Sequence, residues 1–332
     1  MIHGSLSSLG IVEGGAATLV NALIESAGYE GAVIAPSFRD SIRSDHYALQ
    51  ACSNCCPQNL CPSRERGYTG IIGETVRQLS DSVRSCHPTH SWVGVGKNAS
   101  YLLSGHRNSL TPCGKDSPFF RLMQNNGQVL LLGVGVNSLT NIHAVEDARN
   151  VPYLSAVDPI HRHATYTTNG KRIQYVYPEL IQIVLREAGI LRSKKIGAGF
   201  THVLWARELG SFLWVVTEDD PWCLVLRPQG DKYEPFEDAC SKATRMLSSW
   251  NNNPDRGAWE KLLTISNTTG EPNTFKPTDK PSKNCPAYRG MLRGYHRCAA
   301  NDLPAWEKFD DYPKEPGVAT CEQCNWPKYD ER

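Results

Sequence analysis

A buried strand that leads into a helix is predicted within Gly127-Gln-Val-Leu-Leu-Leu-Gly-Val-Gly-Val-Asn-Ser-Leu-Thr-Asn-Ile-His-Ala-Val-Glu146, a stretch of the 332-residue chain. Its apolar run from Val129 to Leu132 is short and is followed by glycines, which is typical of a buried strand. A helix is predicted over 140–149, with Thr140 or Asn141 placed to cap its first turn. This succession of strand, glycines and helix indicates an α/β fold.

The same alternation continues outward from this stretch in both directions. Periodic apolar residues predict helices over 14–27, 73–79, 99–105, 116–125, 178–188 and 237–250. Short apolar runs predict strands over 32–35, 92–95, 174–177 and 212–216. After residue 228 the chain is rich in Pro, Asn, Asp and Lys, and only the helix over 237–250 is predicted there. We therefore expect a mixed sheet with helices packed on it, followed by a loop-rich, Cys-containing extension.

The composition is that of a globular protein without a strongly charged partner. The chain is 40% hydrophobic and 21% charged, and 35 Lys and Arg against 34 Asp and Glu give a net charge of +1. This balance gives no electrostatic reason to expect nucleic acid or an anionic membrane as a partner. No apolar run approaches the roughly 20 residues that span a bilayer, and residues 1–10 do not resemble a signal peptide. We expect a cytoplasmic protein.

Twelve cysteines are present, and several are closely spaced. Two CxxC pairs, Cys52 with Cys55 and Cys321 with Cys324, have the spacing found in tetrahedral zinc sites. Other cysteines that could complete such a site are Cys56, Cys61, Cys285 and Cys298. Free thiols or an occasional disulfide are the favoured interpretation for a cytoplasmic chain, and structural zinc is the alternative.

His143 and Glu146 are candidates for acid–base chemistry. They are three residues apart in a predicted helix, so they share one helical face. Histidine suits proton transfer near neutral pH. The carboxylate has two interpretations, because it can orient the imidazole or bind a cationic amine. The spacing alone is more often that of a solvated or structural pair.

Three segments, in this order, resemble the aminoglycoside 3-N-acetyltransferase family, which has the antibiotic N-acetyltransferase fold. The first is His3-Gly-Ser-Leu-Ser-Ser-Leu-Gly10 with Glu13-Gly-Gly15. The second is Arg84-Ser-Cys-His-Pro-Thr-His-Ser91, followed by Gly96, Ala99 and His106. The third is Gly127-Gln-Val-Leu-Leu-Leu-Gly-Val-Gly135 with Thr140, His143 and Glu146. Weaker similarity continues to about Arg227, so the resemblance implies an acetyltransferase domain over 1–228 and an appended segment over 229–332.

The resemblance implies transfer of an acetyl group from acetyl-CoA to an amine of an aminoglycoside-like small molecule, and hence a role in antibiotic resistance. It makes His143 the general base and Glu146 its partner. It implies that Ser5, Ser7 and Ser8 bind coenzyme A. We expect these serines in a turn at a helix N-terminus, a position that binds phosphate well. His87 and Ser91 are expected at the pantetheine or acetyl end. The substrate amine is assigned to two acidic residues, Asp147 and Asp158.

Direct transfer in a ternary complex is expected, without an acyl intermediate on Cys86. Its neighbour His87 cannot serve as the base for such a step, because the side chains of adjacent residues on a strand or loop point apart. The implied partners are acetyl-CoA and the amine, in a chain that can form a homodimer. A polycationic substrate prefers an acidic cleft, whereas this chain is nearly neutral. The alternative function is a catalytically silent or zinc-stapled binding protein that retains the fold.

Overall fold

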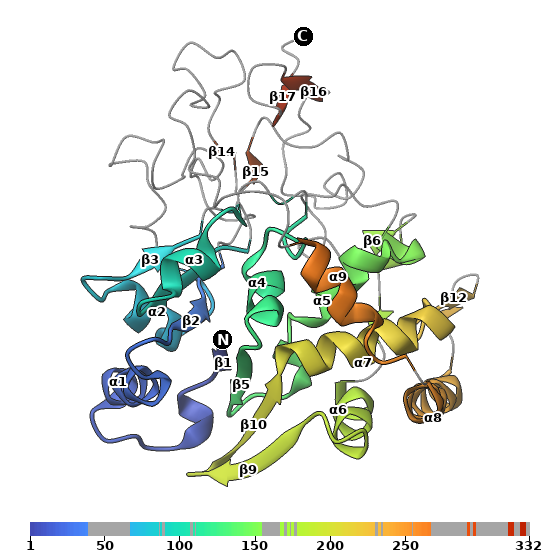
Figure 1. The fold of residues 1–332 in the computed structure, drawn as a ribbon, viewed down its shortest axis with the longest axis horizontal. Helices are drawn as coiled ribbons and strands as arrows, with labels where there is room; N and C mark the ends of the chain where they lie inside the picture. The colour runs from blue at the N-terminus through green and yellow to red at the C-terminus, as the bar shows by residue number, and fades with distance from the viewer. Residues whose placement is uncertain are drawn as a thin grey trace.

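A computed structural model gives the fold of the chain (Figure 1). It describes residues 1–38, 67–85, 87, 90–106, 109, 111–154, 167–168, 171–172, 174–175, 178–229, 232–233, 235–253, 255–266, 291–292, 295–296, 318–321 and 326–329.

Two sheets form the centre of the described structure. The larger has the order β1-β5-β10-β9, in which β1 pairs parallel with β5 and the other pairs are antiparallel. Its strands are β1 (Ile2–Gly4), β5 (Gln128–Leu132), β9 (Arg192–Ile196) and β10 (Gly199–Trp205). The second sheet is antiparallel, with the order β2-β4-β3. Its strands are β2 (Val33–Pro36), β3 (Val83–Arg84) and β4 (Trp92–Val95).

Two groups of helices cover the sheets. Near the second sheet lie α1 (Gly15–Ala27), α2 (Ile71–Arg77) and α3 (Ala99–Leu103). The other group is α4 (Pro118–Gln124), α5 (Ile142–Arg149), α6 (Pro178–Glu187), α7 (Ala206–Asp219), α8 (Phe236–Asn252) and α9 (Ala258–Ser266). In this group α7 is central, since α4, α5, α8 and α9 all pack against it (Figure 1). The predicted mixed α/β fold is confirmed.

Short elements complete the described chain. Antiparallel pairs join β6 (Thr167–Thr168) to β7 (Lys171–Arg172), β8 (Gln174–Tyr175) to β11 (Val225–Leu226), β12 (Pro228–Gln229) to β13 (Lys232–Tyr233), β14 (Met291–Leu292) to β15 (Tyr295–His296), and β16 (Val318–Cys321) to β17 (Trp326–Tyr329). Three 3-10 turns are η1 (Ser7–Leu9), η6 (Val136–Ser138) and η7 (Pro152–Leu154).

Most predicted elements are found within a few residues of their expected bounds. The predicted cap of α5 is wrong, because the Asn141 side chain makes no capping hydrogen bond and the Thr140 hydroxyl donates to the carbonyl of Ser138. The predicted strand over 212–216 is also wrong, because these residues lie inside α7. Neighbouring helices bury α7 on several sides. An apolar run that is buried all round loses its helical period and resembles a buried strand.

The region after residue 228 contains a second helix, α9, that the sequence prediction missed. Trp259 of α9 is fully buried, and its ring lies 5.3 Å from the rings of both Phe120 and Trp214. The indole also covers Gly210 of α7 so closely that a Cβ on that glycine would lie 2.1 Å from Nε1. Trp250 of α8 packs on Phe212 in the same core. The domain division at 228 stays a prediction. The helices α8 and α9, which follow it, contribute side chains to the same core as the residues before it.

The predicted cysteine sites fall largely outside the described residues. This applies to Cys52, Cys55, Cys56, Cys61, Cys86, Cys285, Cys298 and Cys324. Within the described ranges, Cys113, Cys223 and Cys240 are free thiols. No group of three or more His, Cys, Asp or Glu suited to a metal ion occurs among those same residues. Among the helices that the structure describes, none has both the length and the apolarity needed to cross a membrane.

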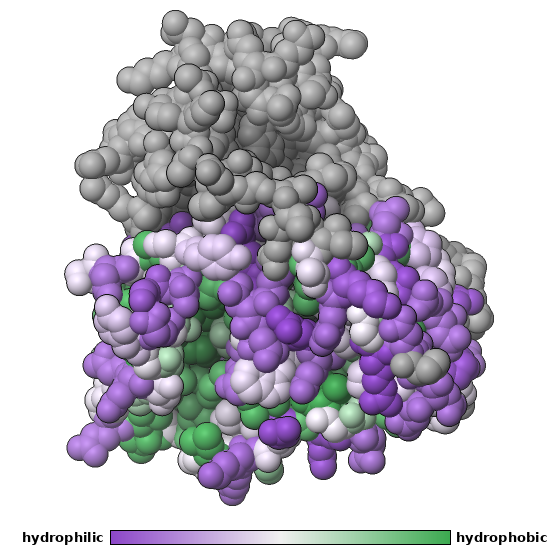
Figure 2. Space-filling view, in the orientation of Figure 1, coloured by the Kyte–Doolittle hydropathy of each residue, from purple (hydrophilic) through white to green (hydrophobic). Residues whose placement is uncertain are grey.

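The surface differs between the two halves of the view. Hydrophilic residues dominate over α7 and α8, whereas hydrophobic residues reach the surface near the β9–β10 hairpin (Figure 2). Ile196 and Phe200 of this hairpin are 46% and 59% exposed, and Ile11, after η1, is fully exposed.

Replacing Trp259 tests whether α9 belongs to the main core. Trp259→Ala removes a buried indole from against α7, so the free energy of unfolding is expected to fall by about 3–5 kcal/mol. Urea denaturation measures this loss. Lys261→Ala, on an exposed position of the same helix, is the control and should change stability by less than about 0.5 kcal/mol. Similar losses in the two variants would contradict the packing described.

Candidate active site

The predicted pair is formed on α5. Nδ1 of His143 lies 2.5 Å from Oε2 of Glu146, one turn further along the helix. The Glu146 side chain is fully buried, whereas that of His143 is 13% exposed. The sequence prediction that the two side chains share a helical face therefore agrees with their geometry.

The carboxylate of Glu146 has a second partner that sequence reasoning missed. The hydroxyl of Tyr153 donates to Oε1 of Glu146 at 2.5 Å. Tyr153 is itself buried and lies in η7, just after α5 ends. The sequence shows only that a tyrosine follows the helix-ending segment Asn150-Val-Pro. This pattern is too common to identify Tyr153 as a partner of Glu146.

This geometry fixes which nitrogen of His143 can act as a base. An ionised carboxylate only accepts hydrogen bonds, so Nδ1 carries the hydrogen that it shares with Glu146. Nε2 is then the nitrogen with a lone pair, and the neighbouring carboxylate favours the imidazolium that forms when it takes a proton. The arrangement is suited to general base catalysis.

A loop before α4 packs beside the pair. The Thr111 hydroxyl donates to Oδ2 of Asp147 at 2.6 Å. Cys113 is buried nearby, and burial together with the charges of Asp147 and Glu146 raises the pKa of its thiol. Asp147, predicted to bind the substrate amine, is thus half-buried and hydrogen bonded to this loop. Asp158, predicted for the same role, lies outside the described residues.

The same loop contacts the second predicted motif through His106. Nε2 of His106 lies 2.8 Å from the carbonyl of Pro112, and Nδ1 lies 2.9 Å from Oγ of Ser85. A carbonyl only accepts, so Nε2 carries the hydrogen and Nδ1 accepts from Ser85. Ser85 in turn accepts from the amide of Trp92. Burial lowers the pKa of His106 to about 3, so the ring is neutral in the native protein.

His87 and Ser91 flank this buried network. The ring of His87 stacks on that of His106 with centroids 4.5 Å apart, and its Nδ1 accepts from the amide of His90. The Ser91 hydroxyl is fully buried, where it donates to the carbonyl of Ser37 and accepts from Nε of Arg84. Both residues therefore have structural contacts, and their contact with coenzyme A stays a prediction.

The predicted serine turn lies at the carboxyl ends of the parallel strands β1 and β5. Oγ of Ser5 lies 3.1 Å from Oγ of Ser7 and accepts from the hydroxyl of Ser8. Gly133, just after β5, has a φ of 66°, and a Cβ there would lie 2.8 Å from Cβ of Ser8. The glycine thus permits the close approach of the two segments. The turn is η1, and α1 begins only at Gly15, so the expected position at a helix N-terminus is wrong.

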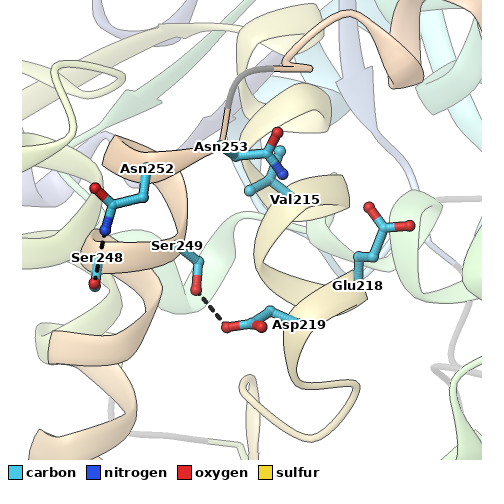
Figure 3. A pocket seen from close by; sticks show the side chains of 7 residues that line it. All are labelled: Val215, Glu218, Asp219, Ser248, Ser249, Asn252 and Asn253. Carbon is cyan, nitrogen blue, oxygen red and sulfur yellow. Dashed lines mark hydrogen bonds between the residues drawn. The ribbon is translucent and has the colours of Figure 1, made fainter.

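The acidic residues Glu218 and Asp219 border a polar groove between the ends of α7 and α8 (Figure 3). Oδ2 of Asp219 accepts from the Ser249 hydroxyl there, and Ser248 accepts from Asn252 (Figure 3). Glu218 lies 3.5 Å from Arg149, the last residue of α5. The groove is lined by α7, α8 and Asn253, so it is separate from the His143–Glu146 pair.

Comparisons with known sequences find aminoglycoside 3-N-acetyltransferases. Residues 1–216 match the family described as aminoglycoside 3-N-acetyltransferase. The chain is 29% identical over 192 residues to aminoglycoside N(3)-acetyltransferase VIII of Streptomyces fradiae, covering 52% of this chain and 62% of that protein. It is 30% identical over 186 residues to aminoglycoside N(3)-acetyltransferase III of Serratia marcescens, covering 54% and 63%. The chain thus spans less than two thirds of the length of these two relatives.

Solved structures show the same fold. One is a histidine-to-alanine mutant of aminoglycoside acetyltransferase AAC(3)-IVa in complex with a gentamicin, with a TM-score of 0.53 and 23% identity. The alignment covers 75% of this chain and 89% of that one. Another is aminoglycoside acetyltransferase AAC(3)-IIb, with a TM-score of 0.51 and 24% identity, covering 66% and 90%.

The buried His106 predicts a pH-dependent stability. Its pKa is about 3 in the folded chain and about 6.5 in the unfolded chain, so below about pH 6.5 only the unfolded state takes up the proton. Each further pH unit, down to the folded pKa, should lower the free energy of unfolding by about 1.4 kcal/mol. Urea denaturation at pH 7.5 and 5.5 measures the difference. His106→Gln, which cannot titrate, should reduce that difference by about 1.4 kcal/mol. An unchanged difference would show that His106 titrates normally.

Proposed function

Because the chain belongs to the aminoglycoside 3-N-acetyltransferase family, we propose that it transfers the acetyl group of acetyl-CoA to an amino group of an aminoglycoside-like small molecule. The observation that carries the proposal is the hydrogen-bonded pair of His143 and Glu146. A partly exposed imidazole held by a fully buried carboxylate is a ready proton acceptor.

His143 serves as the general base in this reaction. An alkyl amine has a pKa of about 10, similar to lysine, so it first loses its ammonium proton to water. As its nitrogen bonds to the thioester carbon, Nε2 of His143 takes a second proton from that nitrogen. The carbon–sulfur bond breaks, and the imidazolium returns the proton to the departing sulfur. The products are the N-acetylated amine and coenzyme A, without an acyl-enzyme intermediate.

Ser5, Ser7 and Ser8 bind coenzyme A in this proposal. Their turn follows β1 and lies against the exit of β5, and ligands of α/β proteins often bind beyond the carboxyl ends of parallel strands. Ser7 and Ser8 are exposed, so their hydroxyls are accessible to a ligand. His87 and Ser91 are assigned to the pantetheine or acetyl end.

Asp147 and Asp158 bind the amine that is acetylated. Asp147 is four residues after His143 on α5, so its carboxylate and the proposed base share one face of the helix. The net charge of +1 favours a substrate of modest positive charge over a strongly polycationic one. A cytoplasmic location and assembly as a homodimer remain predictions of the sequence.

A turnover screen tests the proposed reaction. The full chain is incubated with acetyl-CoA and a panel of aminoglycosides and simpler amines, and free thiol is measured together with the mass of the product. Amine-dependent thiol release with a mass gain of one acetyl group is expected. Absence of acetyl-CoA binding by calorimetry would overturn the proposal and favour a silent protein with this fold.

His143→Ala tests the proposed base. Loss of general base catalysis should lower kcat by about 10²–10⁴-fold, while calorimetric binding of acetyl-CoA is retained. Circular dichroism and a thermal melt check that the variant is folded. Wild-type turnover by His143→Ala would show that another group removes the proton.

Ser7→Ala and Ser8→Ala test the coenzyme A site. Each change removes one hydroxyl hydrogen bond to the ligand, which should raise the Kd for acetyl-CoA by roughly fivefold to tenfold. Ser26→Ala on α1, whose hydroxyl donates to the carbonyl of Ala22, is the control and should bind normally. Equal affinity in all three variants would exclude these hydroxyls from the binding site.

A further inference from the structure

We propose that Tyr153 is a positioning residue, whose phenol holds the Glu146 carboxylate in the orientation that presents its second oxygen to His143. The inference rests on the proposed function for the role of His143 in acetyl transfer. Its geometric basis is a carboxylate shared between two donors, Tyr153 at Oε1 and His143 at Oε2, each at 2.5 Å. Two simultaneous hydrogen bonds fix the rotation of a carboxylate about its last bond, whereas one leaves it freer to turn.

The backbone brings Tyr153 back over the helix that carries Glu146. α5 ends at Arg149, and Asn150 caps it with a left-handed φ of 49°. The amide of Val151 donates to the carbonyl of Glu146 at 3.2 Å, which closes the helix end. The turn η7 then reverses the chain, so that the phenol of Tyr153 reaches a carboxylate seven residues earlier.

An apolar cluster packs around the ring of Tyr153 and holds it in place. Tyr153, Val151, Leu154 and Val225 form a separate buried apolar cluster, on which Trp222 packs. The rings of Tyr153 and Trp222 have centroids 5.4 Å apart. Two members of this cluster, Trp222 and Val225, lie beyond residue 216, where the match to the family ends.

Helix α8 fixes the segment that supports Tyr153. The side chain of Lys242 is buried, and its Nζ donates to the carbonyl of Val225 at 2.6 Å and to that of Trp222 at 3.2 Å. Hydrogen bonds from a buried ammonium are stronger than neutral ones, so they hold this segment firmly. A path of direct contacts thus runs from α8 through Trp222 and Tyr153 to Glu146.

The phenol also affects how strongly Glu146 stabilises a protonated His143. Among the described residues, Asp147 and Arg149 lie on the same helix as Glu146. The charge of Glu146 acts on the thiols of Cys113 and Cys223, and Lys242 and Asp220 also act on Cys223. Without the phenol, the carboxylate is freer to turn away from Nδ1 of His143, so it stabilises imidazolium less. The unprotonated base should then persist to a lower pH.

Tyr153→Phe tests the role, because it keeps the ring and removes only the hydroxyl. We expect kcat for acetyl transfer to fall by roughly tenfold, with little change in the KM for the amine. The acidic limb of the pH profile of kcat/KM should move to lower pH. Tyr29→Phe, at an 84% exposed position, is the matched control and should leave both unchanged. A lower Tm alone, with wild-type kcat and an unmoved acidic limb, would reduce Tyr153 to a structural residue and overturn the proposal.

A measurement without turnover separates this inference from the proposed function. Histidine ring signals of the free protein are followed by NMR against pH, and His143→Gln identifies the signal of His143. The titration midpoint of His143 should be lower in Tyr153→Phe than in the wild type. If that midpoint moves but the wild type transfers no acetyl group, the positioning role holds and the proposed function fails. If the wild type is active and neither midpoint nor kcat changes, the positioning role fails.

Discussion

A carboxylate in a protein interior must be surrounded by hydrogen-bond donors, because an unpaired buried charge is very unfavourable. At Glu146 this requirement is met from two directions, by His143 on the same helix and by Tyr153 on the returning chain. The contacts around the site follow from this need of Glu146 for donors. Both donors reach the Glu146 side chain because of how α5 ends, how η7 turns back and how Trp222 packs on Tyr153. The result is an imidazole whose orientation is set by the core.

The loop before α4 and the second motif support the same helix from another side. Thr111 donates to Asp147, and the adjacent Pro112 carbonyl is held by the neutral ring of His106. His106 in turn receives a hydrogen bond from Ser85, which binds the amide of Trp92 in β4. The second sheet is thereby connected to α5 through directional hydrogen bonds. A neutral histidine serves this purpose better than a charged one in a dry interior.

The family match ends at residue 216, yet the structure that supports the site continues beyond it. Lys242 of α8 holds the segment on which Tyr153 packs, and Trp259 of α9 fills the space over Gly210 of α7. Arg149, at the end of α5, donates to the carbonyl of Trp214 in α7 and lies over its indole ring, 3.4 Å from the centroid. Helices from both parts of the chain therefore share one core and position one site.

Local patterns in the chain are enough to predict the α/β class, most helices and strands, and the pairing of His143 with Glu146, because a helix fixes which residues one turn apart share a face. They do not predict α7 correctly, because the run from Phe212 to Val216 is buried on several sides and loses its period. Tyr153, His106 and Lys242 acquire their partners only when the chain folds back on itself. Such contacts depend on packing between distant segments, which local spacing does not encode. The surroundings of Glu146 are therefore a property of the folded chain as a whole.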